Sequence, residues 1–165
     1  MKSKYVIFLF LILFLFIGKL YSINPPKKLI IKEIMPGNND RLVSDESIVS
    51  VHYAGWLFNG DLKVTDYCNA KGKKFDGTRD PTFRIERGKE KGGGWAPFVF
   101  QIGKNKVIAG WEIGLKNMPE GGKRCLVIPP NLAYGAREIK DVIPANSTLI
   151  FEIELLWFNS LDIKE

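Results

Sequence analysis

Residues 149–157 read LIFEIELLW, and this stretch decides the fold class of the chain. Its residues alternate between two sets, one wholly apolar and the other carrying Glu152 and Glu154. A period of two is typical of a β-strand that has one buried face and one wetted face. The predicted buried set is Leu149, Phe151, Ile153, Leu155 and Trp157, and the set opposite is Ile150, Glu152, Glu154, Leu156 and Phe158.

Shorter stretches earlier in the chain show related patterns. In residues 48–53, Val49, Val51 and Tyr53 share one face, while His52 lies on the other. Turn residues and prolines bound these runs, as expected for strands. The remaining predicted strands are 29–34, 98–102 and 126–128. Because most of them would bury one face only, the sheet is predicted to be antiparallel.

One stretch has a helical period instead. Ile108, Trp111, Leu115 and Met118 are spaced three, four and three residues apart, which is the apolar stripe of an amphipathic helix. The stripe stops near Pro119, so the helix is short. Several strands with one short helix predict an α+β fold in which a sheet folds over the helix.

Two stretches, 59–74 and 80–95, are rich in Gly, Lys and Asp and fit neither period. They are predicted to be long loops, which are often functional or mobile.

Cys68 lies in the first stretch and the other cysteine is Cys125. They form no C-x-x-C pair, and spacing alone does not bring them into bonding distance, so two separate thiols are favoured over a disulfide.

The N-terminus has the pattern of a targeting signal. Lys2 and Lys4 precede an unbroken apolar run at 5–17, and Ser22 closes a cleavage region. We expect an exported protein, periplasmic or secreted; the alternative is an uncleaved membrane anchor through residues 5–18. The predicted organisation is 1–22 signal peptide, 23–28 linker, 29–158 folded domain and 159–165 C-terminal tail.

Charge and motifs exclude several function classes. The chain carries 24 basic and 18 acidic residues, and three of the basic residues lie in the first 22 positions. The remaining balance of 21 to 18 is too mild to indicate a nucleic-acid partner. There is no G-x-S-x-G elbow and no P-loop, and His52, the only histidine, is expected to be structural. No metal or cofactor is predicted.

A series of blocks covering residues 28–157 resembles the FKBP-type peptidyl-prolyl cis-trans isomerase family. No block is specific alone, but they follow the order of the family. They are VHYAG (51–55), KFDGTRD (74–80), PFVFQIG (97–103), VIAGWEIGL (107–115), GGKR (121–124), IP (128–129), LAYG (132–135), IPAN (143–146) and TLIFEIEL (148–155).

The resemblance implies a sheet of five or six antiparallel strands around the helix, and a substrate with an X-Pro bond. It places Trp111 at the floor of an apolar pocket, Asp76 beside the rotating amide, and the Ile108 N–H and the Tyr134 hydroxyl on substrate carbonyls. The implied walls are Tyr53, Phe75, Phe98, Val107, Ile108, Tyr134 and Phe151, with Val142 and Ile143 at the edge. Rapamycin-type macrolides would be inhibitors, proline-containing proteins and peptides the substrates, and the protein a monomer.

Each implied site residue also has a plainer interpretation. Trp111 and Phe151 suit ordinary core packing, and Asp76 suits a turn. Phe100 is expected to be mainly core. The loop at 136–141 lacks the glycines and the proline that are common there in the family. The resemblance therefore leaves open which substrates the protein prefers. The alternative function is a non-catalytic chaperone or peptide-binding module of the same fold.

Overall fold

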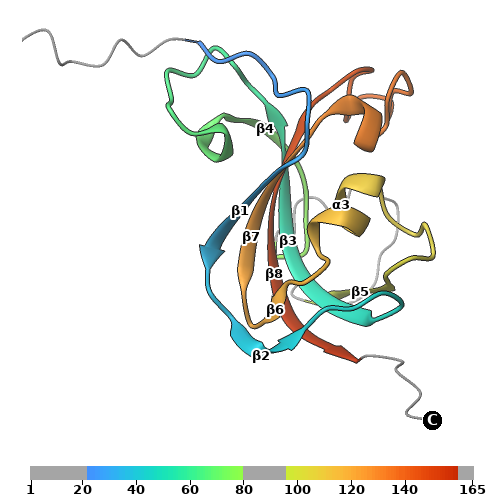
Figure 1. Cartoon of the computed structure of the whole chain (residues 1–165). Coiled ribbons are helices and arrows are strands. Elements are labelled where there is room, and N and C mark those ends of the chain that lie inside the picture. Colours follow the sequence, from blue (N-terminus) through green and yellow to red (C-terminus); the bar gives the residue numbers. More distant parts are fainter. Residues whose placement is uncertain (1–21, 80–95, 160–165) are drawn as a thin grey trace, which may run out of the picture.

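The computed structural model describes residues 22–79 and 96–159, and all structural statements below concern these residues (Figure 1). The strands are β1 (Ile30–Met35), β2 (Asn38–Leu42), β3 (Ile48–Phe58), β4 (Lys71–Gly77), β5 (Phe98–Gln101), β6 (Pro119–Glu120), β7 (Lys123–Ile128) and β8 (Leu149–Asn159). The helices are α3 (Ala109–Gly114) and the 3₁₀ turns η2 (Tyr67–Asn69) and η3 (Pro130–Leu132).

Six strands form one antiparallel sheet in the order β1-β7-β8-β3-β4, with β5 also paired to β3. The strands β2 and β6 form a small second sheet. Figure 1 shows α3 lying against one face of the curved main sheet. The predicted α+β class and the predicted sheet of five or six strands around one short helix are therefore confirmed.

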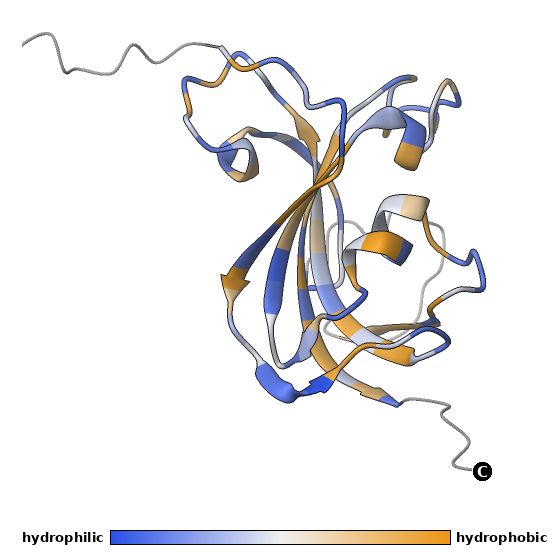
Figure 2. Cartoon of the chain, in the orientation of Figure 1, coloured by the Kyte–Doolittle hydropathy of each residue, from blue (hydrophilic) through white to orange (hydrophobic). Residues whose placement is uncertain are grey.

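The inner core lies between α3 and the sheet, and Figure 2 shows the apolar residues along both. Trp111, Leu115 and Met118 are buried, as the helical stripe predicted. Glycine allows the helix to approach the sheet closely, because a Cβ atom at Gly114 would lie only 2.5 Å from Leu126 Cδ1. The buried strand residues facing this layer include Val49, Val51, Leu126, Ile128, Leu149, Phe151, Ile153 and Leu155.

The helix is shorter than the stripe that predicted it, because it ends at Gly114. Its C-terminal carbonyls need partners inside the protein. Arg124, which is buried, donates from its guanidinium to the carbonyl oxygens of Gly114 at 2.8 Å, Lys116 at 2.8 Å and Asn117 at 2.9 Å. This arginine therefore pairs the last carbonyl of α3 and two carbonyls of the turn that follows it.

The buried set predicted for the last strand is wrong at its end. The register places Ser50 opposite Trp157 but Val51 opposite Leu155, so the strand gains one residue there. A bulge of one residue exchanges the two faces of a strand beyond it. As a result Trp157 is 45% exposed, and Phe158 is buried in the inner core.

The predicted loop at 59–74 is only partly a loop, since η2 and the first residues of β4 lie within it.

The prediction of two separate thiols is also wrong: Cys68 and Cys125 form a disulfide with a Cα–Cα distance of 6.2 Å. The reason is that η2 folds back over the outer face of β7. The two cysteines belong to a second buried group, the outer cluster, made of Cys68, Ala70, Cys125, Val127 and Ile150.

The N-terminal segment also reaches the outer cluster. Ile23 packs against it, and the Ile23 N–H donates to the Gly60 carbonyl oxygen at 2.9 Å. The predicted signal segment, second long loop and tail fall almost wholly on residues 1–21, 80–95 and 160–165, outside the described ranges. Within residues 22–79 and 96–159, no helix has the length and apolar character needed to cross a membrane.

Candidate functional site

An aromatic cluster centred on Trp111 lies at the junction of α3 and the sheet. The Trp111 ring centroid is 5.0 Å from that of Tyr53, 5.2 Å from that of Phe151 and 6.3 Å from that of Phe98. All three contacts are edge-on, the geometry that the ring quadrupoles favour. Trp111 lies on the buried stripe of α3, and residues of three strands, β3, β5 and β8, converge on its ring.

The cluster passes from closed to open across its members. Trp111 and Phe151 are each 4% exposed, whereas Phe98 is 38% exposed and Tyr53 is partly buried. Phe75 extends the cluster from β4, with its ring 5.6 Å from that of Phe151. Phe100 is buried as expected and packs 5.8 Å from Trp111. A buried floor and an accessible aromatic side suit an apolar ligand.

One carboxylate stands beside these rings. The Tyr53 hydroxyl donates to Asp76 Oδ2 at 2.8 Å, and the backbone N–H of Gly77 donates to Asp76 Oδ1 at 2.9 Å. Hydrogen bonds to both oxygens fix the plane of the carboxylate, because each oxygen is held by a separate donor. Asp76 therefore serves as more than a turn residue, since its side chain is bound to the aromatic cluster.

The start of α3 contributes backbone polar groups. Ile108 is the N-cap of the helix, with extended backbone at φ −62° and ψ 149°, and Val107 and Ile108 pack on the inner core. The N–H groups at a helix start have no partner within the helix. Nearby, Trp111 Nε1 is buried without a hydrogen-bond partner among the described residues. Trp111 Nε1 is closed off from the surface, so the donors that could meet a ligand carbonyl here are backbone N–H groups at the helix start.

The loop after η3 carries the other predicted site residues. Tyr134 is 37% exposed, Val142 is partly buried against the inner core and Ile143 is buried. Ile139 and Ile143 exchange two backbone hydrogen bonds of 2.8 Å, so the segment closes into a tight hairpin. Ile143 thus supports this hairpin from beneath, while Val142 lies nearer the surface.

The structure therefore connects most of the predicted residues directly. Ring contacts and hydrogen bonds join Tyr53, Phe75, Asp76, Phe98, Trp111 and Phe151. Sequence reasoning missed Thr78, whose hydroxyl oxygen accepts a hydrogen bond from the Tyr53 N–H at 3.0 Å. Its position two residues after Asp76 was the available signal, because β4 ends there beside β3.

Several known proteins are similar to this chain in sequence. The model of the FKBP-type peptidyl-prolyl cis-trans isomerase family matches residues 39–156. An FK506-binding protein of Neisseria meningitidis serogroup A is 38% identical over 128 residues, which are 78% of this chain and 94% of that protein. FK506-binding protein 1 of Aspergillus oryzae is 40% identical over 111 residues, 67% of this chain and 82% of the relative.

A third relative is much longer. FK506-binding protein 4 of Chaetomium thermophilum is 45% identical over 116 residues, which are 70% of this chain but only 18% of that protein. The chain belongs to the FKBP-type peptidyl-prolyl cis-trans isomerase family, and it is an enzyme of that class.

Proposed function

We propose that the aromatic cluster is the catalytic site, and that it accelerates rotation of X-Pro bonds by binding the twisted amide without covalent chemistry. The observation that carries this proposal is the Asp76 carboxylate held against the rings by Tyr53 at 2.8 Å. A buried core has no need for a charged group there, whereas a rotating amide gains from one. The proposed roles of the individual residues rest on the family resemblance and on these contacts.

The physical problem is the resonance of the peptide bond. Rotation faces a barrier of about 18–20 kcal/mol, because the partial double bond must be broken. At X-Pro bonds the cis and trans forms differ by only about 0.5–1 kcal/mol, so both are populated and exchange takes tens to hundreds of seconds. The planar amide has a larger dipole than the twisted one, and an apolar site therefore disfavours the ground state more than the transition state.

Each polar group then has a role. Trp111 carries the proline ring on its face, and the Ile108 N–H and the Tyr134 hydroxyl bind carbonyl groups on either side of the rotating bond. Asp76 lies beside the rotating carbonyl, whose carbon becomes more positive once the nitrogen lone pair is withdrawn from resonance. The fixed carboxylate favours that charge without reorganising during the step. Val142 borders the residue before proline.

We also propose that macrolides of the FK506 and rapamycin type occupy the same cluster. The relatives at 38% and 40% identity are named for FK506 binding, and the cluster gives this chain a partly exposed aromatic surface for an apolar ligand. Competition with a peptide substrate tests the proposal. Unchanged isomerase activity at saturating macrolide would show that the site does not accept the drug.

The substrates are proposed to be exported proteins. The basic and apolar N-terminal segment supports export, and the Cys68–Cys125 disulfide supports it independently, because disulfides persist in oxidising compartments. Mass measurement of the protein from the periplasm or medium tests this. Loss of residues 1–22 is expected; full-length protein in a membrane fraction would indicate the anchor, and cytosolic protein would refute export.

The deciding experiment is the rate of cis-trans exchange in a short peptide with an apolar residue before proline. The wild type is compared with Trp111→Leu, Asp76→Val and Tyr53→Phe, each checked for native near-UV circular dichroism. Losing one charge-assisted hydrogen bond should lower kcat/KM of Tyr53→Phe by about tenfold or more. Phe58→Leu is the matched aromatic control, because Phe58 packs against the outer cluster, and it should retain the wild-type rate.

Two outcomes would redirect the proposal. If Asp76→Val and Tyr53→Phe are folded and fully active, the site lies elsewhere on the molecule. If the folded wild type fails to accelerate exchange but suppresses aggregation of an unfolded protein, the chain is a chaperone or peptide-binding module. The second result would conflict with the family assignment of the activity.

A further inference from the structure

Thr78, the residue that follows β4, forms hydrogen bonds with both the backbone N–H and the backbone carbonyl of Tyr53. The Tyr53 N–H donates to Thr78 Oγ1 at 3.0 Å, and the Thr78 N–H donates to the Tyr53 carbonyl oxygen at 3.0 Å. Thr78 Oγ1 also lies 2.9 Å from His52 Nδ1. Thr78 is buried, and it therefore joins the histidine on the outer face of β3 to the backbone of the tyrosine that holds Asp76.

The number of hydrogens decides the direction of these bonds. A threonine hydroxyl has one proton to donate and two lone pairs that accept. Since the Thr78 oxygen accepts from Tyr53, its own proton goes either to His52 Nδ1 at 2.9 Å or to the Tyr53 carbonyl at 3.4 Å. The carbonyl is farther away and already accepts the Thr78 N–H. A neutral His52 with its proton on Nε2 therefore completes the network.

Protonation of the imidazole would reverse one bond. A charged histidine donates from both nitrogens and accepts at neither. The Thr78 oxygen would then receive hydrogens from Tyr53 and His52 together, and its proton would have to turn to the carbonyl 3.4 Å away. A contact of 3.4 Å is longer than an ordinary O–H···O bond, so either the bond is lost or the Tyr53 backbone moves toward it.

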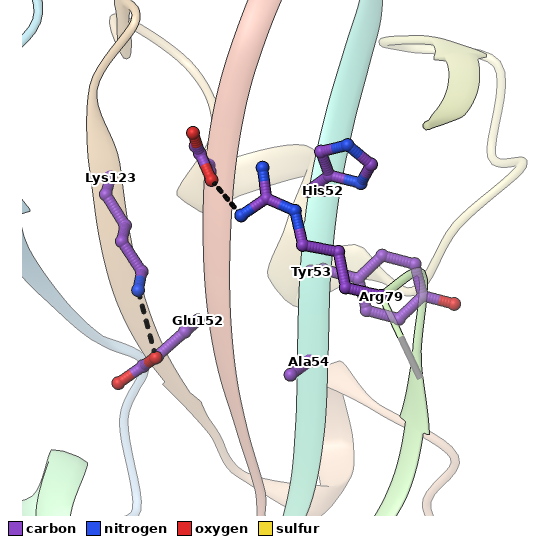
Figure 3. A pocket seen from close by; sticks show the side chains of 7 residues that line it. His52, Tyr53, Ala54, Arg79, Lys123 and Glu152 are labelled. Atoms are coloured by element: carbon purple, nitrogen blue, oxygen red, sulfur yellow. Dashed lines mark hydrogen bonds and ion pairs between the residues drawn. The ribbon is translucent and has the colours of Figure 1, made fainter. Parts of the chain in front are cut away.

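The charges around His52 come from three further segments. Arg79 follows β4, Glu152 and Glu154 lie on β8, and Lys123 lies on β7, all lining one hollow with His52. Figure 3 shows the Arg79 guanidinium beside His52, pointing toward β8, where it pairs with Glu154 at 2.8 Å. Burial lowers the pKa of His52 most, Arg79 lowers it further, and Glu154 opposes them. This environment favours the neutral imidazole.

We propose that His52 and Thr78 are positioning residues of the isomerase, in which neutral His52 accepts the Thr78 hydroxyl proton and so sets the Tyr53–Asp76 pair. Protonation of His52 reverses this hydrogen bond and lowers the activity. The inference rests on the proposed role of Asp76, which Tyr53 reaches through its own hydroxyl at 2.8 Å. It adds a residue from the outer face of the sheet to a site on the inner face.

The chain is suited to a direct test because it contains a single histidine. Imidazole ¹⁵N NMR of the full chain, prepared without a histidine tag, reports its tautomer and its titration with no assignment step. The expected result is the Nε2–H tautomer at pH 8. Loss of one hydrogen bond should lower kcat/KM by about two- to tenfold as His52 becomes protonated. A mixture of both tautomers at pH 8 would overturn the proposal.

Variants separate this effect from pH effects that arise elsewhere in the protein. His52→Asn keeps an acceptor that does not titrate, so the activity at pH 8 should remain and the fall over the His52 titration should disappear. Thr78→Val removes the hydroxyl and should lose activity at every pH, while Thr78→Ser should restore it. Identical pH profiles for the wild type and His52→Asn would refute the proposal. Full activity of Asp76→Val at every pH would instead refute the proposed site.

Discussion

The two faces of the sheet are built differently. The inner core joins α3 to five strands, β3, β4, β5, β7 and β8, through large aliphatic and aromatic side chains. The outer cluster has only five buried residues, and two of them are the bonded cysteines. The inner face is closed by packing alone, whereas the outer face covers less apolar area and uses a covalent bond. The face with the smaller core therefore depends more on the disulfide for its stability.

The bulge in β8 gives the sharpest test of this division, because it decides which face each of two adjacent aromatic residues joins. Phe158 is buried opposite Val49, and Trp157 is 45% exposed. Phe158→Ala should lower the free energy of unfolding by about 3–5 kcal/mol, as for other buried aromatic residues. Trp157→Ala should change it by only about 0.5 kcal/mol. Urea unfolding measures both.

A strand without the bulge would give the opposite order, with the larger loss at Trp157. Val99→Ala offers a matched control, because Val99 lies opposite Ser50 on the exposed side of the same row and is 51% exposed. It should behave like Trp157→Ala. Equally small losses at Phe158 and Trp157 would mean that neither side chain is buried at this end of the sheet.

The disulfide tests the outer face by itself. The bridge closes a loop between residues 57 apart in the sequence, and the chain-entropy relation assigns such a loop about 4 kcal/mol of stability. The double variant Cys68→Ala/Cys125→Ala should lose about 2–4 kcal/mol of unfolding free energy. Hydrogen exchange should rise first at η2 and the start of β4, while α3 stays protected.

Reduction of the wild type by a dithiol provides the control. It should reproduce the stability loss of the double variant, and the same reductant should leave the double variant unchanged. If exchange rises equally in α3 and η2, the two faces unfold as one unit and the comparison between them fails.

Much of the inner face could be predicted from the sequence, because its patterns are local. The helical stripe through Trp111 and the alternation in β8 each lie within one element, and the FKBP blocks gave the residues around them. The bulge that moves Phe158 inward was not visible, since it depends on the register between β3 and β8. A register is a long-range property that no single strand specifies.

The outer face was harder to predict for the same reason. Cys68 and Cys125 meet only because η2 folds over β7, and nothing in the spacing of the two residues shows that approach. Thr78 likewise lies inside a recognised block, KFDGTRD (74–80), but the block does not show that its hydroxyl reaches β3. In both cases the missing information was which distant segment lies across the sheet, whereas the residue types themselves were plainly in view.

The smallest expected effect comes from a charged row on the outer face, made of Lys71, Lys123 and Glu152. Glu152 pairs with Lys71 and with Lys123. Burial raises the pKa of Glu152, but hydrogen bonds and charges from the two lysines outweigh it, so the pKa lies below its ordinary value. A carboxylate with a lowered folded pKa adds stability above the unfolded pKa, and that stability disappears as the pH falls through the folded pKa.

Urea unfolding between pH 7 and pH 3 should therefore show a contribution of about 0.5–1 kcal/mol from this carboxylate that Glu152→Gln lacks. Lys123→Met should remove part of the same contribution, because one of the two cations is lost. Trp157→Gln, also on the outer face but uncharged, should follow the wild-type pH curve. If Glu152→Gln follows that curve as well, the charged row adds nothing to stability, and the outer face depends on its disulfide and small apolar cluster alone.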